Sequence, residues 1–220
     1  MINCPLCQSS QISSTSHKVW PAESHNHCSV CDLIFLKKEF RLSNEKEKER
    51  YSHHKNDLKF PSYRKYLSQF IVDHDKFKNL KILDFGCGPH ENLAILLNEL
   101  NVAADSFDPF FGPALKSPTP KYDIIFAIEV FEHFHEPMME LIKLQKMLNS
   151  SGIVKIYTQL HQGTEHFYNW WYARDPTHVV FYSNKTANWI AENFLYETQL
   201  RELHSHNHCS PFLFLQVKAT

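Results

Sequence analysis

The order of apolar and polar positions along the chain predicts alternating helices and strands. Apolar residues recur at helical spacing in four segments, 58–77, 93–100, 138–148 and 183–194. Strands are predicted over three further segments, 81–85, 103–108 and 153–157. Two last strands, 195–203 and 212–218, are predicted on either side of a polar turn. The pattern favours an α/β domain, and a chain of 220 residues is long enough for one such domain and a small appendage.

Four cysteines near the start of the chain are spaced like the ligands of a metal ion. They form two Cys-x-x-Cys pairs separated by 20 residues: Cys4, Cys7, Cys28 and Cys31. Each tight pair offers two thiolates, and two pairs complete a tetrahedral shell around Zn²⁺ that leaves no position for water. We therefore expect a structural zinc ribbon over 1–40, with a redox pair or free thiols as the alternative. His25 and His27 are expected to be exposed loop residues.

Charge and hydropathy limit the remaining possibilities. Residues 41–60 are rich in charge, which predicts a solvated linker or an exposed helix before a domain over 61–220. Because 23 Lys and Arg nearly balance 24 Asp and Glu, no basic field would attract nucleic acid or an anionic membrane. The chain has neither an apolar run of the roughly 20 residues that cross a bilayer nor a secretory signal pattern. We expect a cytoplasmic protein, and no feature of the sequence predicts an oligomeric state.

A glycine loop follows the first predicted strand of the α/β domain. The strand 81–85 leads directly into Gly86 and Gly88, and glycine lets a backbone come close to a ligand. A dinucleotide site would need a further glycine where this chain has Glu91, whose carboxylate would repel a pyrophosphate. Asp108 ends the next strand, 20 residues beyond Gly88, where an acid can accept hydrogen bonds from ribose hydroxyls. Together these features indicate a nucleoside without a pyrophosphate.

Residues 83–88 resemble motif I of the class I S-adenosylmethionine-dependent methyltransferases. The resemblance implies a Rossmann-like fold, in which a parallel sheet carries an antiparallel C-terminal strand. It also implies that S-adenosylmethionine is the cofactor, with Asp84, Gly86 and Gly88 at its amino-acid end and Asp108 at its ribose. The sequence departs from the motif at His90, which stands where the family usually has a third glycine.

Residues 122–133 are similar to the fourth strand of the same family and the loop that follows it. Glu129 is a candidate cofactor ligand, because ligands bind at the carboxyl ends of the strands in doubly wound sheets. His133, in the following loop, is a candidate ligand contact and a candidate catalytic residue. The interval 108–123 is short, so the family's usual third strand and its helix are expected to be reduced or absent. A polar turn at 149–152 is expected between the helix 138–148 and the fifth strand.

An aromatic segment over 166–178 contains two of the four tryptophans and an Asp-x-x-His pattern. It resembles a subgroup of these enzymes in which the Asp and the His lie on a loop that caps the active site. Aromatic walls would hold an acceptor close and exclude water. His178 is the candidate base for the acceptor's proton, with Tyr172 and Asp175 to orient it. The alternative is an aromatic core in which His178 bonds to the backbone.

Three functions follow from these features. The first is methyl transfer from S-adenosylmethionine to a small-molecule acceptor such as a sugar or a quinone-like metabolite; zinc ribbons also occur with such domains in some sugar C-methyltransferases. The second is a non-catalytic binding protein of the same fold, in which His90 impairs the cofactor site. The third is an RNA methyltransferase that grips RNA with the ribbon, which the near-neutral charge disfavours.

Overall fold

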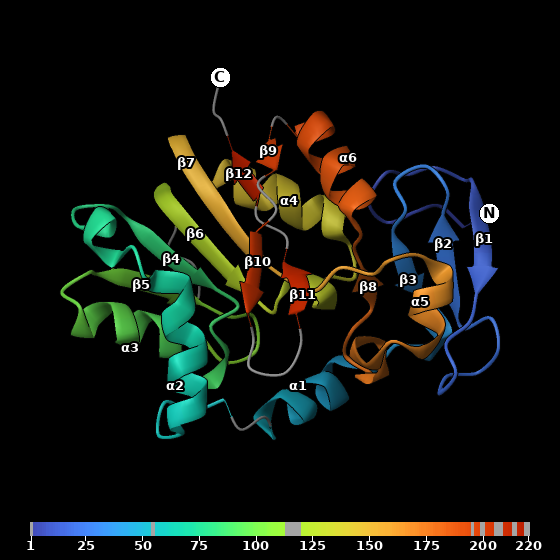
Figure 1. The fold of residues 1–220 in the computed structure, drawn as a ribbon, viewed down its shortest axis with the longest axis horizontal. Coiled ribbons are helices and arrows are strands. Elements are labelled where there is room, and N and C mark those ends of the chain that lie inside the picture. Colours follow the sequence, from blue (N-terminus) through green and yellow to red (C-terminus); the bar gives the residue numbers. More distant parts are fainter. Residues whose placement is uncertain are drawn as a thin grey trace.

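In the computed structural model the chain has a central parallel sheet with helices on both faces (Figure 1). The structure describes residues 2–53, 56–112 and 120–194 with nearly all their side chains, and the backbone of 196–198, 201–204, 209–212 and 215–217. The sheet has the order β5-β4-β6-β7. Its strands are β4 (Ile82–Phe85), β5 (Ala104–Phe107), β6 (Tyr122–Ile128) and β7 (Leu148–Tyr157), and all neighbours are parallel. The predicted α/β class is confirmed.

Side chains on alternate strand positions enter two different cores, as a strand period of two residues requires. Ile82 and Ile124 face one core, with α2 (Pro61–Ser68) and α3 (Asn92–Glu99). Leu83 and Ile125 face the other, with α4 (Pro137–Lys146) and α6 (Asn184–Phe194). Because both faces are covered, the strands are apolar along most of their length.

Four short strands follow α6 and form two antiparallel pairs. β9 (Tyr196–Thr198) pairs with β12 (Leu215–Val217), and β10 (Arg201–His204) pairs with β11 (Cys209–Phe212). β12 lies beside β7 (Figure 1). The predicted C-terminal strands are therefore present, each divided into two. The predicted polar turn lies largely at 205–208, outside the described residues.

The N-terminal segment forms an antiparallel sheet that includes a strand from far along the chain. Its order is β1-β2-β3-β8, comprising β1 (Ile12–Thr15), β2 (His25–Cys28), β3 (Ile34–Leu36) and β8 (Val180–Phe181). Leu33 and Phe35 share a hydrophobic cluster with Leu83 of the central sheet. The segment therefore has a common core with the α/β domain.

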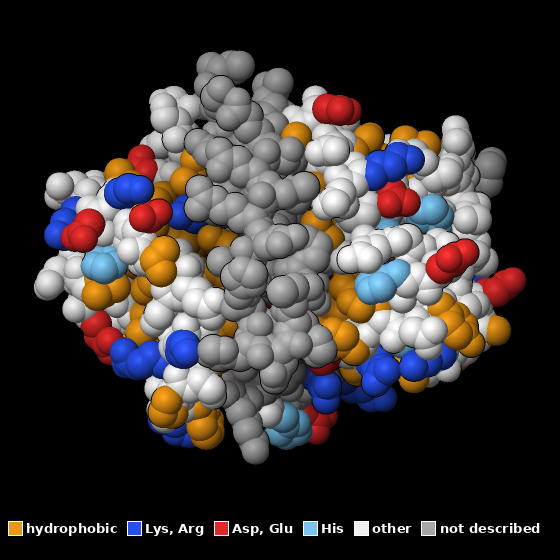
Figure 2. Space-filling model, viewed as in Figure 1, with side chains coloured by type: hydrophobic (Ala, Val, Ile, Leu, Met, Phe, Trp, Pro, Cys, Tyr) orange, Lys and Arg blue, Asp and Glu red, His pale blue; other side chains and the backbone are white. Residues whose placement is uncertain are grey.

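Helices and turns beside the two sheets complete the described fold. They are α1 (Asn44–Ser52), α5 (Thr164–Asn169) and six 3₁₀ turns: η1 (Lys38–Phe40), η2 (Gln69–Ile71), η3 (His74–Phe77), η4 (Gly88–His90), η5 (Phe131–His133) and η6 (Trp171–Arg174). None of the helices in the described ranges is long and apolar enough to span a bilayer. In Figure 2, hydrophobic side chains flank the central grey band and charged ones lie mainly around the rim.

Two local predictions are wrong. His25 is not an exposed loop residue, because it lies on β2 with no exposed surface, among the rings of Trp20, Phe167 and Phe181. His27 is also on β2, and its ring bonds to Asp32 at 2.7 Å. The predicted turn at 149–152 lies within β7, where a side chain at Gly152 would come 2.8 Å from the Tyr122 carbonyl.

The charged segment 41–60 contains α1, a largely exposed helix, which was one of the two structures predicted for it. This helix begins after Ser43, whose hydroxyl accepts a hydrogen bond from the Lys46 amide. Its charges are not all solvated, because Glu47 is buried and accepts a hydrogen bond from Tyr51 at 2.6 Å.

Candidate active site

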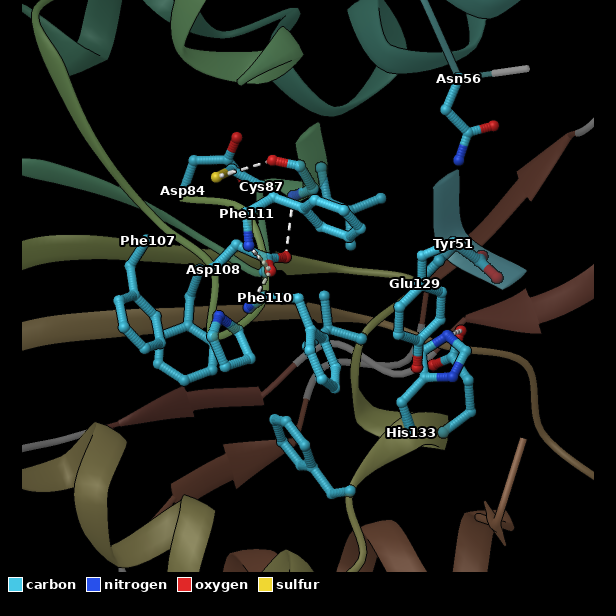
Figure 3. A pocket seen from close by; sticks show the side chains of 18 of the residues that line it. Tyr51, Asn56, Asp84, Cys87, Phe107, Asp108, Phe110, Phe111, Glu129 and His133 are labelled. Atoms are coloured by element: carbon cyan, nitrogen blue, oxygen red, sulfur yellow. Dashed lines mark hydrogen bonds and ion pairs between the residues drawn. The ribbon is translucent and has the colours of Figure 1, made fainter. Parts of the chain in front are cut away.

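A cavity of about 900 Å³ opens at the carboxyl ends of β4, β5 and β6. Ligands of doubly wound sheets bind at this edge. Figure 3 shows two groups of side chains in it. One surrounds Asp84, Cys87 and Asp108 at the glycine loop; the other contains Tyr51, Glu129 and His133.

The glycine loop presents bare main chain to the cavity. Gly86 has a φ of +80°, and a side chain there would come 2.5 Å from Val130. Gly88 has a φ of +64°, with no atom within 4 Å of where its side chain would begin. Both glycines line the cavity. At Gly86 the close approach excludes any side chain, and at both positions the left-handed φ favours glycine.

Asp108 holds the glycine loop in place from the end of β5. Its carboxylate accepts hydrogen bonds from the Gly88 amide at 3.0 Å and from the amides of Phe110 and Phe111 at 2.8 and 3.1 Å. The side chain also lines the cavity (Figure 3). A carboxylate has about four acceptor positions, so Asp108 can receive a further hydrogen bond from a ligand hydroxyl.

Asp84 lies buried at the end of β4, on the cavity wall. Burial, together with the negative charges of Asp108 and Glu91, raises its pKa to about 7. A positive group of a ligand would relieve this repulsion. Asp84 therefore suits the cationic end of a bound molecule.

His90 is exposed and is not among the residues that line the cavity. The imidazole therefore leaves free the space beside the glycine loop. The side chain at position 90 therefore gives no reason to expect an impaired cofactor site.

Glu129 lies just beyond β6 with a left-handed φ of +53°. Its two carboxylate oxygens accept hydrogen bonds from Tyr66 at 3.1 Å and from Tyr172 at 3.0 Å. Burial, together with the neighbouring charge of Glu132, raises its pKa to about 8. The two phenols hold this carboxylate against the cavity wall.

Two histidines meet at the far end of the cavity. The rings of His133 and His178 are 4.9 Å apart between centroids, in an edge-to-face arrangement. His133 Nδ1 bonds to the Thr177 carbonyl at 2.8 Å, and His178 Nδ1 bonds to the Tyr172 carbonyl at 2.7 Å. Since a carbonyl only accepts, each Nδ1 carries the proton and each Nε2 is the basic atom. Burial lowers the pKa of His133, which favours the neutral ring.

The structure separates the other two predicted catalytic side chains from the cavity surface. Tyr172 is buried behind Glu129, with its ring 4.3 Å from that of His178. Asp175 does not line the cavity; it accepts hydrogen bonds from the Thr177 amide and hydroxyl and pairs with Arg50 of α1 at 2.7 Å. His178 makes the hydrogen bond to the backbone that the alternative prediction expected, and it also lines the cavity.

Comparison with known proteins identifies the fold. A family model described as a methyltransferase domain matches residues 51–198. The chain belongs to this family. No curated protein matches the chain. The predicted methyltransferase is thereby confirmed.

Solved structures agree at the level of the fold. Magnesium protoporphyrin IX methyltransferase of Synechocystis, with bound SAH, matches 82% of this methyltransferase and 97% of its own chain, at 12% identity and a TM-score of 0.53. The plantazolicin methyltransferase BpumL, in complex with a pentazolic desmethylPZN analog and SAH, matches 79% of this chain and 90% of its own, at 15% identity and a TM-score of 0.51. The chain spans 54% of the length of the citrinin polyketide synthase CMeT domain, at 12% identity and a TM-score of 0.49.

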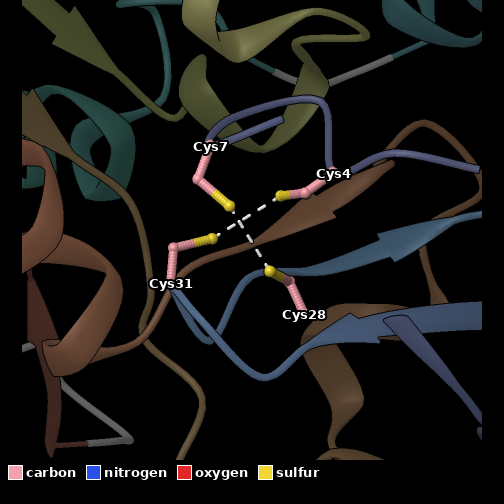
Figure 4. Close-up of side chains that lie close together, drawn as sticks. All are labelled: Cys4, Cys7, Cys28 and Cys31. Atoms are coloured by element: carbon pink, nitrogen blue, oxygen red, sulfur yellow. Dashed lines mark hydrogen bonds between the residues drawn. The ribbon is translucent and has the colours of Figure 1, made fainter. Parts of the chain in front are cut away.

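The methyltransferase also has a cysteine cluster, in its N-terminal sheet (Figure 4). Cys4 and Cys31 Sγ are 3.5 Å apart, and Cys7 and Cys28 Sγ are 3.4 Å apart. Four thiolates about 2.3 Å from one Zn²⁺ would stand about 3.8 Å from each other, so the cluster fits a tetrahedral ion after a small expansion. Three of the four cysteines are buried.

Sequence reasoning missed several residues of the active site. Glu47 and Tyr51 of α1 and Tyr66 of α2 line the cavity, and Glu132 is buried in its wall. In the sequence, Tyr66 belongs only to the apolar helical pattern of 58–77, and Glu132 belongs to the loop after the fourth strand. A single buried acid among the charges of 41–60 gives no periodic signal, because only the docking of α1 distinguishes it.

Proposed function

We propose that this methyltransferase transfers the methyl group of S-adenosylmethionine to a small-molecule acceptor. The observation that supports this most is the bare main chain at Gly86 and Gly88 between two carboxylates, Asp84 and Asp108. Asp84 would pair with the ammonium of the cofactor, Asp108 would accept hydrogen bonds from its ribose, and Glu129 would close the wall between cofactor and acceptor. When bound, the cofactor supplies a methyl group on a positively charged sulfur.

The residues around the acceptor bind, shield and deprotonate it. Phe110, Phe134 and Trp171 line the cavity and would exclude water from the transfer. The Nε2 atoms of His133 and His178 are the basic atoms available for an acceptor proton. Asp175 and Arg50 position the loop that carries His178, which agrees with the Asp-x-x-His subgroup, and Tyr172 fixes Glu129 from behind.

The charge of the cavity favours a neutral or cationic acceptor. Its lining contains seven acids: Glu47, Asp84, Asp108, Glu129, Glu132, Glu136 and Glu140. Among the described lining residues Lys143 is the only Lys or Arg, and it lies 3.3 Å from Glu140. A phosphorylated acceptor or an RNA backbone would meet strong repulsion here.

We propose in addition that Cys4, Cys7, Cys28 and Cys31 bind a structural Zn²⁺ in a zinc ribbon. Four thiolates would fill the ion's shell, so this site would supply folding energy and not chemistry.

Calorimetric titration with S-adenosylmethionine and with SAH tests the main proposal. We expect both to bind, and Asp108→Asn to weaken binding roughly 10- to 100-fold, because a charged hydrogen-bond acceptor is lost. His90→Gly is the matched control in the same loop and should bind within about twofold of the wild type, since the side chain lies outside the cavity. Failure of the folded wild type to bind either compound would contradict the proposal.

A further inference from the structure

Three side chains at the acceptor end of the cavity hold metal-ligand atoms close together. Glu132 and His133 lie on η5, directly after β6, and His178 follows η6. One ligand atom from each lies within 4.8 Å of the others. All three residues line the cavity, far in sequence from the cysteine cluster.

Both histidine rings are held as metal-ligating imidazoles usually are. His133 and His178 each donate Nδ1–H to a backbone carbonyl, at 2.8 and 2.7 Å. Such a bond fixes the tautomer and the ring orientation and makes the opposite nitrogen a better ligand. The carbonyls belong to Thr177 and Tyr172, so the segment 172–178 orients both rings.

Glu132 has an oxygen for which the described protein provides no hydrogen-bond donor. The side chain is fully buried, and Oε2 accepts a hydrogen bond from Thr158 at 2.8 Å, while Oε1 accepts none. Oε1 lies 3.9 Å from His133 Nε2, beyond hydrogen-bond distance. Two ligands of one ion stand about 3.0 to 3.4 Å apart, so a cation between them would need only a small closure.

Acids outnumber bases in the cavity wall, where seven acids and one lysine line the cavity. Most of the seven have hydrogen-bond or ion-pair partners, but Glu132 keeps one buried oxygen without a donor. A buried polar atom without a partner is costly. A divalent cation beside Glu132 would supply the missing partner.

We propose that Glu132, His133 and His178 bind a divalent transition-metal cation, and that the acceptor is a hydroxyl compound whose oxygen binds the same ion. Two imidazoles and one carboxylate suit Mn²⁺, Fe²⁺, Co²⁺ or Zn²⁺ better than Mg²⁺ or Ca²⁺. Three protein ligands leave open positions for water or substrate, unlike the four cysteines.

This inference rests on the proposed function and assigns the acceptor's chemistry. In this arrangement the Nε2 atoms of the two rings bind the cation instead of accepting the acceptor's proton. The cation lowers the pKa of the bound hydroxyl, and the proton passes to solvent water. The oxygen lone pair then forms the bond to the methyl carbon as the carbon–sulfur bond breaks. The products are the methyl ether and the neutral thioether SAH, and one proton is released.

Titration of the full chain with Mn²⁺, followed by electron paramagnetic resonance, tests the site; the protein is prepared with no more than one Zn²⁺ per chain, so that zinc does not fill the cavity site. We expect about one Mn²⁺ per chain, and binding at least about 100-fold weaker in His178→Ala and in Glu132→Gln. Glu132→Gln keeps the size of the side chain and an acceptor for Thr158, so it tests the site even if His178→Ala does not fold. His90→Ala, which removes an exposed imidazole outside the cavity, should bind like the wild type.

Calorimetry with S-adenosylmethionine on the same samples separates the two proposals. Absence of Mn²⁺ binding, or equal binding in wild type and both variants, with cofactor binding intact would overturn the metal site alone. Mn²⁺ binding that depends on Glu132 and His178, in a wild type that binds no cofactor, would overturn the methyltransferase proposal and support the metal site.

Discussion

The cysteine cluster of the N-terminal sheet and the Glu132–His133–His178 group of the cavity present two kinds of candidate metal ligand. Four soft thiolates surround one point and are largely buried, and they come from two Cys-x-x-Cys turns. The second group offers three mixed donors and faces a cavity of about 900 Å³. A closed shell suits stability, whereas an open one suits chemistry. The comparison indicates that a filled shell away from the cavity and an incomplete shell in its wall suit two different roles.

The largest effect is expected from removing a ligand of the closed cluster. Cys28→Ser should abolish zinc binding and lower the free energy of unfolding by at least about 3 kcal/mol, because metal binding and folding are coupled. Leu33 and Phe35, beside the cluster, share a core with the central sheet, so the loss should affect the whole chain.

Zinc content by mass spectrometry and thermal melting would measure this. Cys87→Ser is the matched control, because Cys87 lies in the glycine loop and not in the cluster. An unchanged melting temperature in Cys28→Ser would contradict a structural role for the cysteine cluster.

The next effect concerns the charge of Asp84 in the open cavity. The pKa of Asp84 is about 7 in the folded protein, above its ordinary value of 3.8, so the ionised carboxylate is penalised. The free protein therefore loses stability as pH rises from about 4 to 7. At pH 8 Asp84→Asn should stabilise it by at most about 4 kcal/mol. The same change should weaken S-adenosylmethionine binding by roughly 10- to 100-fold.

Titrations at pH 6, 7 and 8 would isolate this carboxylate. Wild-type affinity for the cofactor should rise with pH through 7, because the cation favours ionised Asp84, and the variant should show a flatter profile. The groups that face Asp84 are Asp108, Glu91 and the phenol of Tyr63. Equal pH profiles in the two proteins would assign the dependence to another group.

The smallest effect on stability is expected at the ion pair between α1 and the loop of His178. Arg50→Ala breaks the 2.7 Å ion pair with Asp175. Because the Arg50 side chain is 46% exposed, the free energy of unfolding should change by less than about 1 kcal/mol. The turnover number should nevertheless fall several-fold, because the loop that carries His178 loses a positioning contact.

Arg64→Ala is the matched control for this prediction. Arg64 pairs with Glu99 at 2.6 Å with similar exposure, 43%, but this pair joins α2 to α3 and not α1 to the loop of His178. Both variants should melt at nearly the same temperature, and only Arg50→Ala should lose turnover. An equal loss in both would show that the α1 contact has no particular part in catalysis.

The sequence by itself determined the elements whose signal is local. Period and composition predicted the strands and helices of the α/β domain, because burial on one or two faces imposes a repeat on neighbouring residues. The Gly86–Gly88 loop and the Cys-x-x-Cys pairs were visible for the same reason: their chemistry needs a fixed short spacing.

Only the tertiary structure decided which distant residues meet. The pairing of β3 with β8, the burial of Glu47 and the approach of His133 to His178 join positions 44 or more residues apart, or depend on how a helix docks. No periodic pattern encodes such contacts, since they follow from the packing of whole elements. The exposure of His90, which removed the main objection to a cofactor site, was likewise set by the path of the chain around the glycine loop.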